Sequence, residues 1–138
     1  MKQRILVVED DEDIIKLLKL YLENDGYDVI TCTNGVDALE ILKNIKIDLA
    51  VLDIMMPKMD GYELTKRIRQ LSNLPVIILS AKNEVSDKVL GLSIGADDYK
   101  TKPFNPLEII ARIKSNLRRF YDLNKDEPSK EPDRKSVV

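Results

Sequence analysis

Near the middle of the chain runs Asp48-Leu49-Ala50-Val51-Leu52-Asp53-Ile54-Met55-Met56-Pro57, where a short apolar run leads directly into a carboxylate. An uninterrupted and partly β-branched run of this length is typical of a parallel strand buried on both faces. Pro57, Asp60 and Gly61 then mark a turn. Asp53 is therefore expected at the carboxyl end of a central strand, where open α/β sheets bind their ligands. Taken alone, the stretch favours the simpler interpretation that Asp53 only caps a strand end.

Four further segments have the composition of strands, and segments with helical spacing lie between them. The strands are expected at residues 49–52 and also at 4–8, 27–32, 75–80 and 98–101. The helices are expected after Asp11, after residues 33–35, and at about 62–70, 85–94 and 106–119. This alternation predicts an α/β fold of the flavodoxin-like (βα)5 type, a doubly wound sandwich whose parallel sheet has the order 2-1-3-4-5. The inner face of the last helix is expected to hold Leu107, Ile110, Ile113 and Leu117.

The chain has 138 residues, of which 43% are hydrophobic and 33% charged, enough for one domain with its own core. No segment has the composition of a membrane span or a signal peptide. The single cysteine, Cys32, has no partner for an internal disulfide, which agrees with a reducing, cytoplasmic location. Residues 124–138 are charged and contain two prolines. We therefore expect a domain over residues 1–121 and a linker or tail over 122–138.

The chain contains no histidine, and its net charge is −2. The lack of histidine excludes Ser-His-Asp and Cys-His catalysis and histidine-ligated zinc. Any metal must then be held by oxygen atoms, so Mg²⁺, Ca²⁺ and Mn²⁺ are the candidates. The negative net charge makes the chain a poor electrostatic match for nucleic acid.

Polar side chains follow four of the expected strands at the point where each strand ends. The first strand is followed by Glu9 and Asp10, the third by Asp53 and the fifth by Lys102, while the fourth ends on Ser80. In a sheet of order 2-1-3-4-5 these strands are neighbours, so the side chains are expected to converge on one cleft. Three carboxylates repel one another there, and one lysine cannot neutralise them, which calls for a divalent cation. A cation, an ammonium and a hydroxyl together are suited to binding a phosphoryl group.

Each of these residues also has a simpler interpretation. Glu9 and Asp10 could be acids that are favoured at a helix start, Ser80 a loop hydroxyl and Lys102 a solvated lysine. For a single residue the simpler interpretation is the more frequent one. Four strand ends that carry these residue types together are a much rarer coincidence, so the combination favours a phosphoryl site.

Four motifs together resemble the response-regulator receiver domain of bacterial two-component systems, over about residues 3 to 120. They are Val7-Val8-Glu9-Asp10-Asp11, Leu52-Asp53-Ile54-Met55-Met56-Pro57 with Asp60-Gly61, Leu79-Ser80-Ala81, and Lys102-Pro103-Phe104. Within that family, Gly95-Ala96-Asp97-Asp98-Tyr99 and Leu117-Arg118-Arg119 resemble the OmpR/PhoB type. Two positions depart from the pattern, since Ser80 replaces a more frequent threonine and Lys100 stands where an apolar residue is commoner.

The resemblance implies a signalling switch rather than a turnover enzyme. Asp53 would be the phosphoacceptor and would take the phosphoryl group from a phosphohistidine on a sensor histidine kinase. Lys102 would pair with the phosphoryl oxygens, and Ser80 would move to hydrogen-bond them. Tyr99 would then turn inward behind Ser80. The chain would catalyse only its own phosphorylation and slow autodephosphorylation.

The resemblance also implies a metal site beside the phosphoacceptor. Mg²⁺, or alternatively Mn²⁺, would be bound by the carboxylates of Asp10 and Asp53 and by the backbone carbonyl of Met55. Glu9 would contribute directly or through a water molecule.

A symmetric homodimer promoted by phosphorylation is the third implication. Three pairs of opposite charge would form across its two-fold axis, namely Lys88 with Glu108, Asp97 with Arg119, and Asp98 with Arg112. Leu92 and Ile110 would supply the apolar centre of the interface. The simpler alternative is that the charged residues are solvated surface, where ion pairs stabilise little.

Proteins of the OmpR/PhoB type usually continue through a linker into a winged-helix DNA-binding domain. Contact with DNA is therefore expected only through an effector domain outside this chain, and no contact with a membrane is expected. A natural single-domain receiver that acts only through protein–protein contact is the alternative.

A metal-dependent phosphatase is disfavoured because Met55 stands where its second carboxylate would be. A nucleotide or flavin module is disfavoured because residues 9–12 are acidic rather than glycine-rich.

Overall fold

The structure, a computed structural model, describes residues 2–125, so most of the predicted linker lies outside the described residues. Within this range five parallel strands form one sheet in the order β2-β1-β3-β4-β5. They are β1 (Arg4–Val8), β2 (Asp28–Cys32), β3 (Leu49–Leu52), β4 (Val76–Ser80) and β5 (Asp98–Thr101). The predicted fold class and strand order are confirmed.

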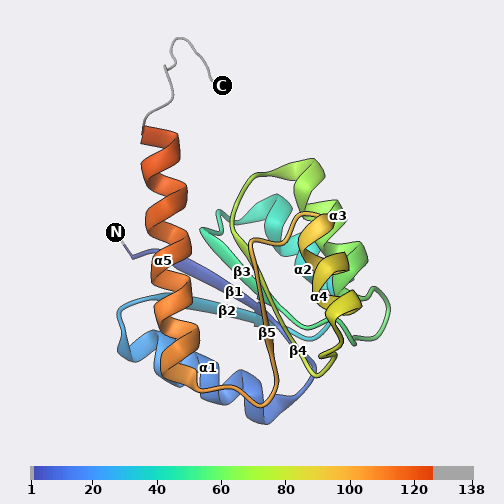
Figure 1. Cartoon of the computed structure of the whole chain (residues 1–138). Helices are drawn as coiled ribbons and strands as arrows, with labels where there is room; N and C mark the ends of the chain where they lie inside the picture. The colour runs from blue at the N-terminus through green and yellow to red at the C-terminus, as the bar shows by residue number, and fades with distance from the viewer. Residues whose placement is uncertain (1, 126–138) are drawn as a thin grey trace.

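Helices cover both faces of the sheet (Figure 1). The described residues form α1 (Glu12–Asn24), α2 (Gly35–Asn44), α3 (Gly61–Leu71), α4 (Val85–Ser93) and α5 (Pro106–Lys125). Figure 1 shows α1 and α5 on one face of the sheet and α2, α3 and α4 on the other. Among the helices of residues 2–125, none is long and apolar enough to cross a membrane.

Short polar side chains cap the starts of α1, α2 and α3. Asp11 caps α1, where one of its carboxylate oxygens accepts hydrogen bonds from the backbone amides of Asp13 at 2.9 Å and Ile14 at 3.3 Å. Asn34 and Asp60 accept equivalent bonds at the starts of α2 and α3. Each cap satisfies a backbone amide that has no partner inside its helix, a contribution of about 1 kcal/mol.

The apolar strands divide their side chains between two cores. Along β1, Ile5 and Val7 face the core beneath α1 and α5, whereas Leu6 and Val8 face the core beneath α2 and α3. All four side chains are 1% exposed or less. The central strands are buried on both faces, which explains why their apolar runs are uninterrupted rather than alternating.

The last helix differs from the prediction in its inner face and in its length. Leu107 is 66% exposed, and Ile109, which is fully buried, takes the expected place beside Ile113 and Leu117. Positions 109, 113 and 117 repeat every four residues and lie on one face of a helix, and Leu107 lies outside this repeat. The helix also continues to Lys125, beyond the predicted end near residue 119.

Candidate functional site

Three of the predicted polar residues are in contact at the carboxyl ends of the strands. The ammonium nitrogen of Lys102 lies 2.9 Å from Oε1 of Glu9 and 3.1 Å from Oδ2 of Asp53. These residues follow β5, β1 and β3, which the sheet order brings to the same edge. Glu9 and Asp53 are only 3% and 6% exposed, so Lys102 bridges two buried carboxylates.

Asp10 completes an acidic group at this edge. One carboxylate oxygen each from Glu9, Asp10 and Asp53 lies within 4.8 Å of the other two, and Asp10 is the exposed member. Three carboxylates face a single ammonium, so negative charge remains in excess. Oxygen ligands of this kind suit a hard divalent cation such as Mg²⁺. The chemistry of the site therefore fits the predicted metal.

Burial and charge alter the titration of two groups in the cluster. Burial raises the pKa of Glu9 to about 7, because the hydrogen bond from Lys102 offsets only part of the desolvation and the Asp53 carboxylate opposes ionisation. For Lys102, burial alone lowers the pKa, but the Glu9 and Asp53 carboxylates outweigh it and the pKa is raised. The ammonium therefore stays charged at neutral pH, while Glu9 titrates there.

Both oxygens of Asp53 are held in place. Its Oδ1 accepts hydrogen bonds from the backbone amides of Ile54 at 2.7 Å and Met55 at 3.4 Å, and Oδ2 faces Lys102. The Met55 side chain is 61% exposed. The role predicted for the Met55 carbonyl in metal binding remains a prediction.

Gly61 lies against the backbone of the phosphoacceptor candidate. Its amide donates to the carbonyl of Ile54 at 2.8 Å, and a β-carbon at this position would fall 2.2 Å from the carbonyl oxygen of Asp53. Only glycine allows the start of α3 to approach the loop after β3 this closely. The sequence analysis predicted a turn at this point. The Asp60-Gly61 pair that indicated the turn is also the sequence feature that indicates the close approach.

Ser80 and Tyr99 meet at the backbone of Lys82. The hydroxyl oxygen of Ser80 accepts a hydrogen bond from the Lys82 amide at 3.2 Å, and the Tyr99 hydroxyl donates to the Lys82 carbonyl at 2.9 Å. Ser80 is fully buried and Tyr99 is 8% exposed, so the tyrosine occupies the inward position. The sequence analysis did not single out Lys82, which contributes only backbone atoms.

Gly91 provides the space for this tyrosine. A β-carbon at Gly91 would lie 2.9 Å from a carbon of the Tyr99 ring and 3.0 Å from the side chain of Ile78. The ring is therefore packed directly beneath α4. The sequence analysis gave Gly91 no functional role.

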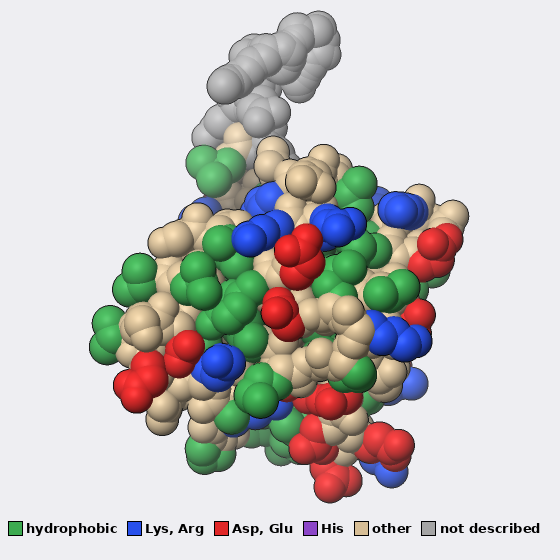
Figure 2. Space-filling model, turned by 90° about the vertical axis from the view of Figure 1, so that its right-hand side faces the viewer, with side chains coloured by type: hydrophobic (Ala, Val, Ile, Leu, Met, Phe, Trp, Pro, Cys, Tyr) green, Lys and Arg blue, Asp and Glu red, His purple; other side chains and the backbone are tan. Residues whose placement is uncertain are grey.

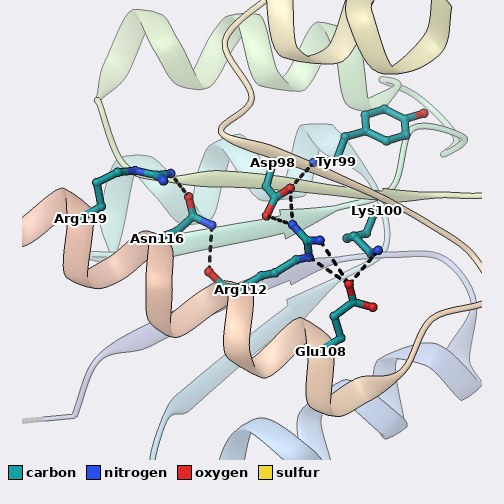
Figure 3. A network of polar contacts seen from close by, with 7 residues as sticks. All are labelled: Asp98, Tyr99, Lys100, Glu108, Arg112, Asn116 and Arg119. Carbon is teal, nitrogen blue, oxygen red and sulfur yellow. Dashed lines mark hydrogen bonds and ion pairs between the residues drawn. The ribbon is translucent and has the colours of Figure 1, made fainter. Parts of the chain in front are cut away.

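Several charges predicted to pair across a dimer form a network within the chain (Figure 3). Arg112 lies 2.9 Å from Asp98 and 3.2 Å from Glu108, and Lys100 lies 2.8 Å from Glu108. Arg119 donates to the side chain of Asn116, which in turn donates to the Arg112 carbonyl at 2.8 Å. Figure 3 shows this network joining β5 to α5.

Asp97 has partners of its own within the chain. Its carboxylate lies 2.7 Å from the guanidinium of Arg69 and accepts a hydrogen bond from the Val76 amide at 2.9 Å. Arg69 also donates to the carbonyls of Gly95 at 2.9 Å and Leu74 at 2.7 Å. Arg69 was not among the predicted residues, because the carboxylate with which it pairs is 28 residues away in the sequence.

The two residues predicted for an apolar dimer centre differ in exposure. Leu92 is 47% exposed, but Ile110 is 7% exposed and belongs to the core beneath α5. Other exposed apolar side chains of α4 lie near Leu92 in the sequence, namely Val85 and Val89, which are 76% and 56% exposed. Lys88 is also exposed and forms no ion pair within residues 2–125.

A family model and several similar proteins place the chain in the same protein family. Residues 5–114 match the family model described as the response regulator receiver domain. The chain is 53% identical over 120 residues to the alkaline phosphatase synthesis transcriptional regulatory protein PhoP of Bacillus subtilis, covering 86% of this chain and 50% of that protein. It is 50% identical over 127 residues to the response regulator GtcR of Aneurinibacillus migulanus, covering 92% of this chain and 52% of that protein. The chain thus spans about half the length of these curated relatives.

Solved structures agree with the fold. The Francisella response regulator 1452 receiver domain aligns with a TM-score of 0.83 at 39% identity, over 86% of this chain and 99% of that chain. The BeF3-activated N-terminal receiver domain of Klebsiella pneumoniae RstA aligns with a TM-score of 0.81 at 34% identity, over 84% of this chain and 99% of that chain.

Proposed function

The chain belongs to the response-regulator receiver domain family, of the OmpR/PhoB type, and we propose that it is a phosphorylation-driven switch with Asp53 as phosphoacceptor. Receiver domains of this family are signalling parts of two-component systems. The observation that carries the proposal is the contact of Lys102 with Asp53, 3.1 Å between Nζ and Oδ2, inside a buried acidic cluster. The carboxylate oxygen is positioned to accept a phosphoryl group, and the ammonium is positioned to bind the oxygens of that group.

In the proposed transfer, a carboxylate oxygen of Asp53 attacks the phosphorus atom of a phosphohistidine on a sensor histidine kinase. The P–O bond forms as the P–N bond breaks, and the histidine nitrogen leaves with the electron pair. The chain contains no histidine, so the phosphoryl group has to come from a separate donor. Water later attacks the acyl phosphate, returns the carboxylate and releases inorganic phosphate. The chain thus modifies only itself and does not turn over a substrate.

The surrounding residues have distinct tasks in this transfer. Oδ2 of Asp53 is the expected acceptor oxygen, since Oδ1 accepts backbone hydrogen bonds from residues 54 and 55. Lys102 would move its ammonium from Glu9 towards the phosphoryl oxygens, and Ser80 would donate its hydroxyl proton to them. Mg²⁺ or Mn²⁺, held by Glu9, Asp10, Asp53 and the Met55 carbonyl, would supply positive charge at the phosphoryl oxygens.

We infer that the switch is read out at α4, β5 and α5. The Tyr99 ring packs beneath Gly91 of α4 and its hydroxyl binds the backbone beyond Ser80, so a change at Ser80 is transmitted to α4. Figure 2 views the side of α2, α3 and α4 and shows hydrophobic side chains at the surface among charged ones. A phosphorylation-promoted symmetric homodimer would use the surface of α4, β5 and α5. To form the predicted pairs with a second copy, Asp97, Asp98 and Glu108 would exchange or share their present partners.

The complete protein is proposed to be a cytoplasmic transcriptional regulator. The chain spans about half of relatives that include a protein named as a transcriptional regulatory protein, which leaves room for an effector domain of similar size. A winged-helix DNA-binding domain following the linker is the effector that we propose. A stand-alone receiver that acts through protein–protein contact is the alternative.

Intact mass spectrometry tests the central step. The wild-type chain and Asp53→Asn are incubated with a small-molecule phosphodonor, with and without Mg²⁺. We expect a Mg²⁺-dependent gain of one phosphoryl group in the wild type and no gain in the variant. An undiminished gain in Asp53→Asn would reject Asp53 as the acceptor and leave the partner-binding alternative.

A further inference from the structure

Lys100 is the cation of β5 that the proposed phosphoryl chemistry does not use. Its ammonium lies 2.8 Å from Oε2 of Glu108 on α5, as Figure 3 shows. The same oxygen accepts hydrogen bonds from Nη2 of Arg112 at 3.2 Å and from its Nε at 3.3 Å. The opposite end of that guanidinium holds both oxygens of Asp98, at 2.9 and 3.0 Å. Lys100 therefore belongs to a cluster of four charged side chains.

Lys100 determines the net charge of this cluster. Asp98 and Glu108 are two carboxylates, and the single guanidinium of Arg112 leaves one negative charge uncompensated. Lys100 cancels that charge, so the four side chains together are neutral. The hydrogen bond from Lys100, followed by that from Arg112, also lowers the pKa of Glu108, so the carboxylate form is favoured.

The neutral cluster bears on self-association, because Glu108 is the predicted partner of Lys88 on a second copy. Lys88 is exposed and forms no ion pair elsewhere in residues 2–125. A cation gains less electrostatic free energy from approaching a neutral group of charges than from approaching a negative one, so Lys88 of a second copy is attracted less strongly.

We propose that Lys100 weakens self-association at the dimer face, because it cancels the negative charge that would otherwise attract Lys88 of a second copy. The proposal rests on the dimerisation included in the proposed function and names the residue that tunes it. Lys100 would therefore raise the dissociation constant of the homodimer.

The test compares dimer dissociation constants for four variants with the wild type. They are Lys100→Met, Lys88→Met, the double variant, and Lys43→Met as a control that removes an exposed lysine from α2. Each protein is activated with a small-molecule phosphodonor and Mg²⁺, its phosphorylation is measured by intact mass, and its association is measured by sedimentation equilibrium. The series is repeated without phosphodonor.

We expect Lys100→Met to tighten the dimer by about two- to five-fold, the range of an exposed ion pair, and Lys43→Met to leave it unchanged. Adding Lys88→Met should abolish that gain. Equal dissociation constants for wild type and Lys100→Met, or a gain that survives loss of Lys88, would overturn the inference while leaving phosphorylation intact. Fully phosphorylated chains that stay monomeric would reject dimerisation and this inference together. If the protein is not phosphorylated, the proposed function is rejected. The dissociation constants measured without phosphodonor then test the role of Lys100 by the same comparison of variants.

Discussion

Lys102 lies closer to Glu9 than to the phosphoacceptor candidate Asp53, at 2.9 Å against 3.1 Å. In this structure the lysine therefore stabilises the charge of Glu9 as well as that of Asp53. Burial nevertheless keeps the pKa of Glu9 at about 7, so the ammonium offsets the desolvation only in part.

The raised pKa of Glu9 predicts a dependence of stability on pH. The folded protein binds the Glu9 proton more tightly than the unfolded chain, whose pKa is near 4.5. This contribution is fully present below pH 4.5 and is lost as the pH rises through about 7, by an amount on the order of 3 kcal/mol. Urea unfolding in EDTA at pH 5 and pH 8 should show the decline, and Glu9→Gln should flatten it. The same decline in the variant would assign it to another group.

Replacing Lys102 should destabilise the metal-free protein. Lys102→Met leaves Glu9 and Asp53 buried without their cation, which we expect to lower the free energy of unfolding at pH 8 by about 3 kcal/mol. Mg²⁺ should restore part of this loss by binding the same carboxylates. Urea unfolding with and without Mg²⁺ measures both effects, with Lys43→Met as the control. Equal unfolding curves for the two variants would count against the buried bridge.

Gly61→Ala should distort the site rather than merely stiffen the chain. The new β-carbon would fall 2.2 Å from the Asp53 carbonyl oxygen, so the loop after β3 or the start of α3 has to move. We expect a loss of more than about 3 kcal/mol of stability and slower phosphorylation. Gly26→Ala is the matched control, because Gly26 has open space around it and an alanine at its positive φ of 95° costs about 1–2 kcal/mol without any steric clash. Equal losses in the two variants would refute a steric role for Gly61.

The corrected inner face of α5 is tested by two alanine substitutions. Ile109→Ala removes a fully buried side chain and should cost about 2–5 kcal/mol, whereas Leu107→Ala, at a site 66% exposed, should cost less than about 0.5 kcal/mol. Thermal or urea unfolding separates these expectations. The reverse order would restore the face that the sequence pattern predicted.

Tyr99→Phe tests the contact between the tyrosine and the loop after β4. The variant removes the 2.9 Å hydrogen bond to the Lys82 carbonyl but keeps the ring beneath Gly91. We expect a loss of about 1 kcal/mol and faster amide hydrogen exchange in residues 81–85. Unchanged exchange there would show that the hydroxyl does not hold this loop.

Local sequence patterns were sufficient for the element order, the strand order and the residues at the strand ends. Uninterrupted apolar runs identify strands buried on both faces, and the short right-handed connections then leave few sheet orders. Once the order is known, Glu9, Asp53 and Lys102 must lie at one edge. For this reason the predicted cluster appears in the structure with its carboxylates and ammonium in contact.

The tertiary structure alone decided which charges pair and which side chains face the core. α5 offers apolar residues at positions 107, 109, 110 and 113, and only packing against the sheet selects among the possible faces. The pairs Lys100–Glu108 and Arg69–Asp97 join separate elements, so no local periodicity predicts them. The space available at Gly61 and Gly91 likewise depends on atoms from other elements. Local periodicity determines secondary structure, whereas these contacts depend on how the finished elements approach one another.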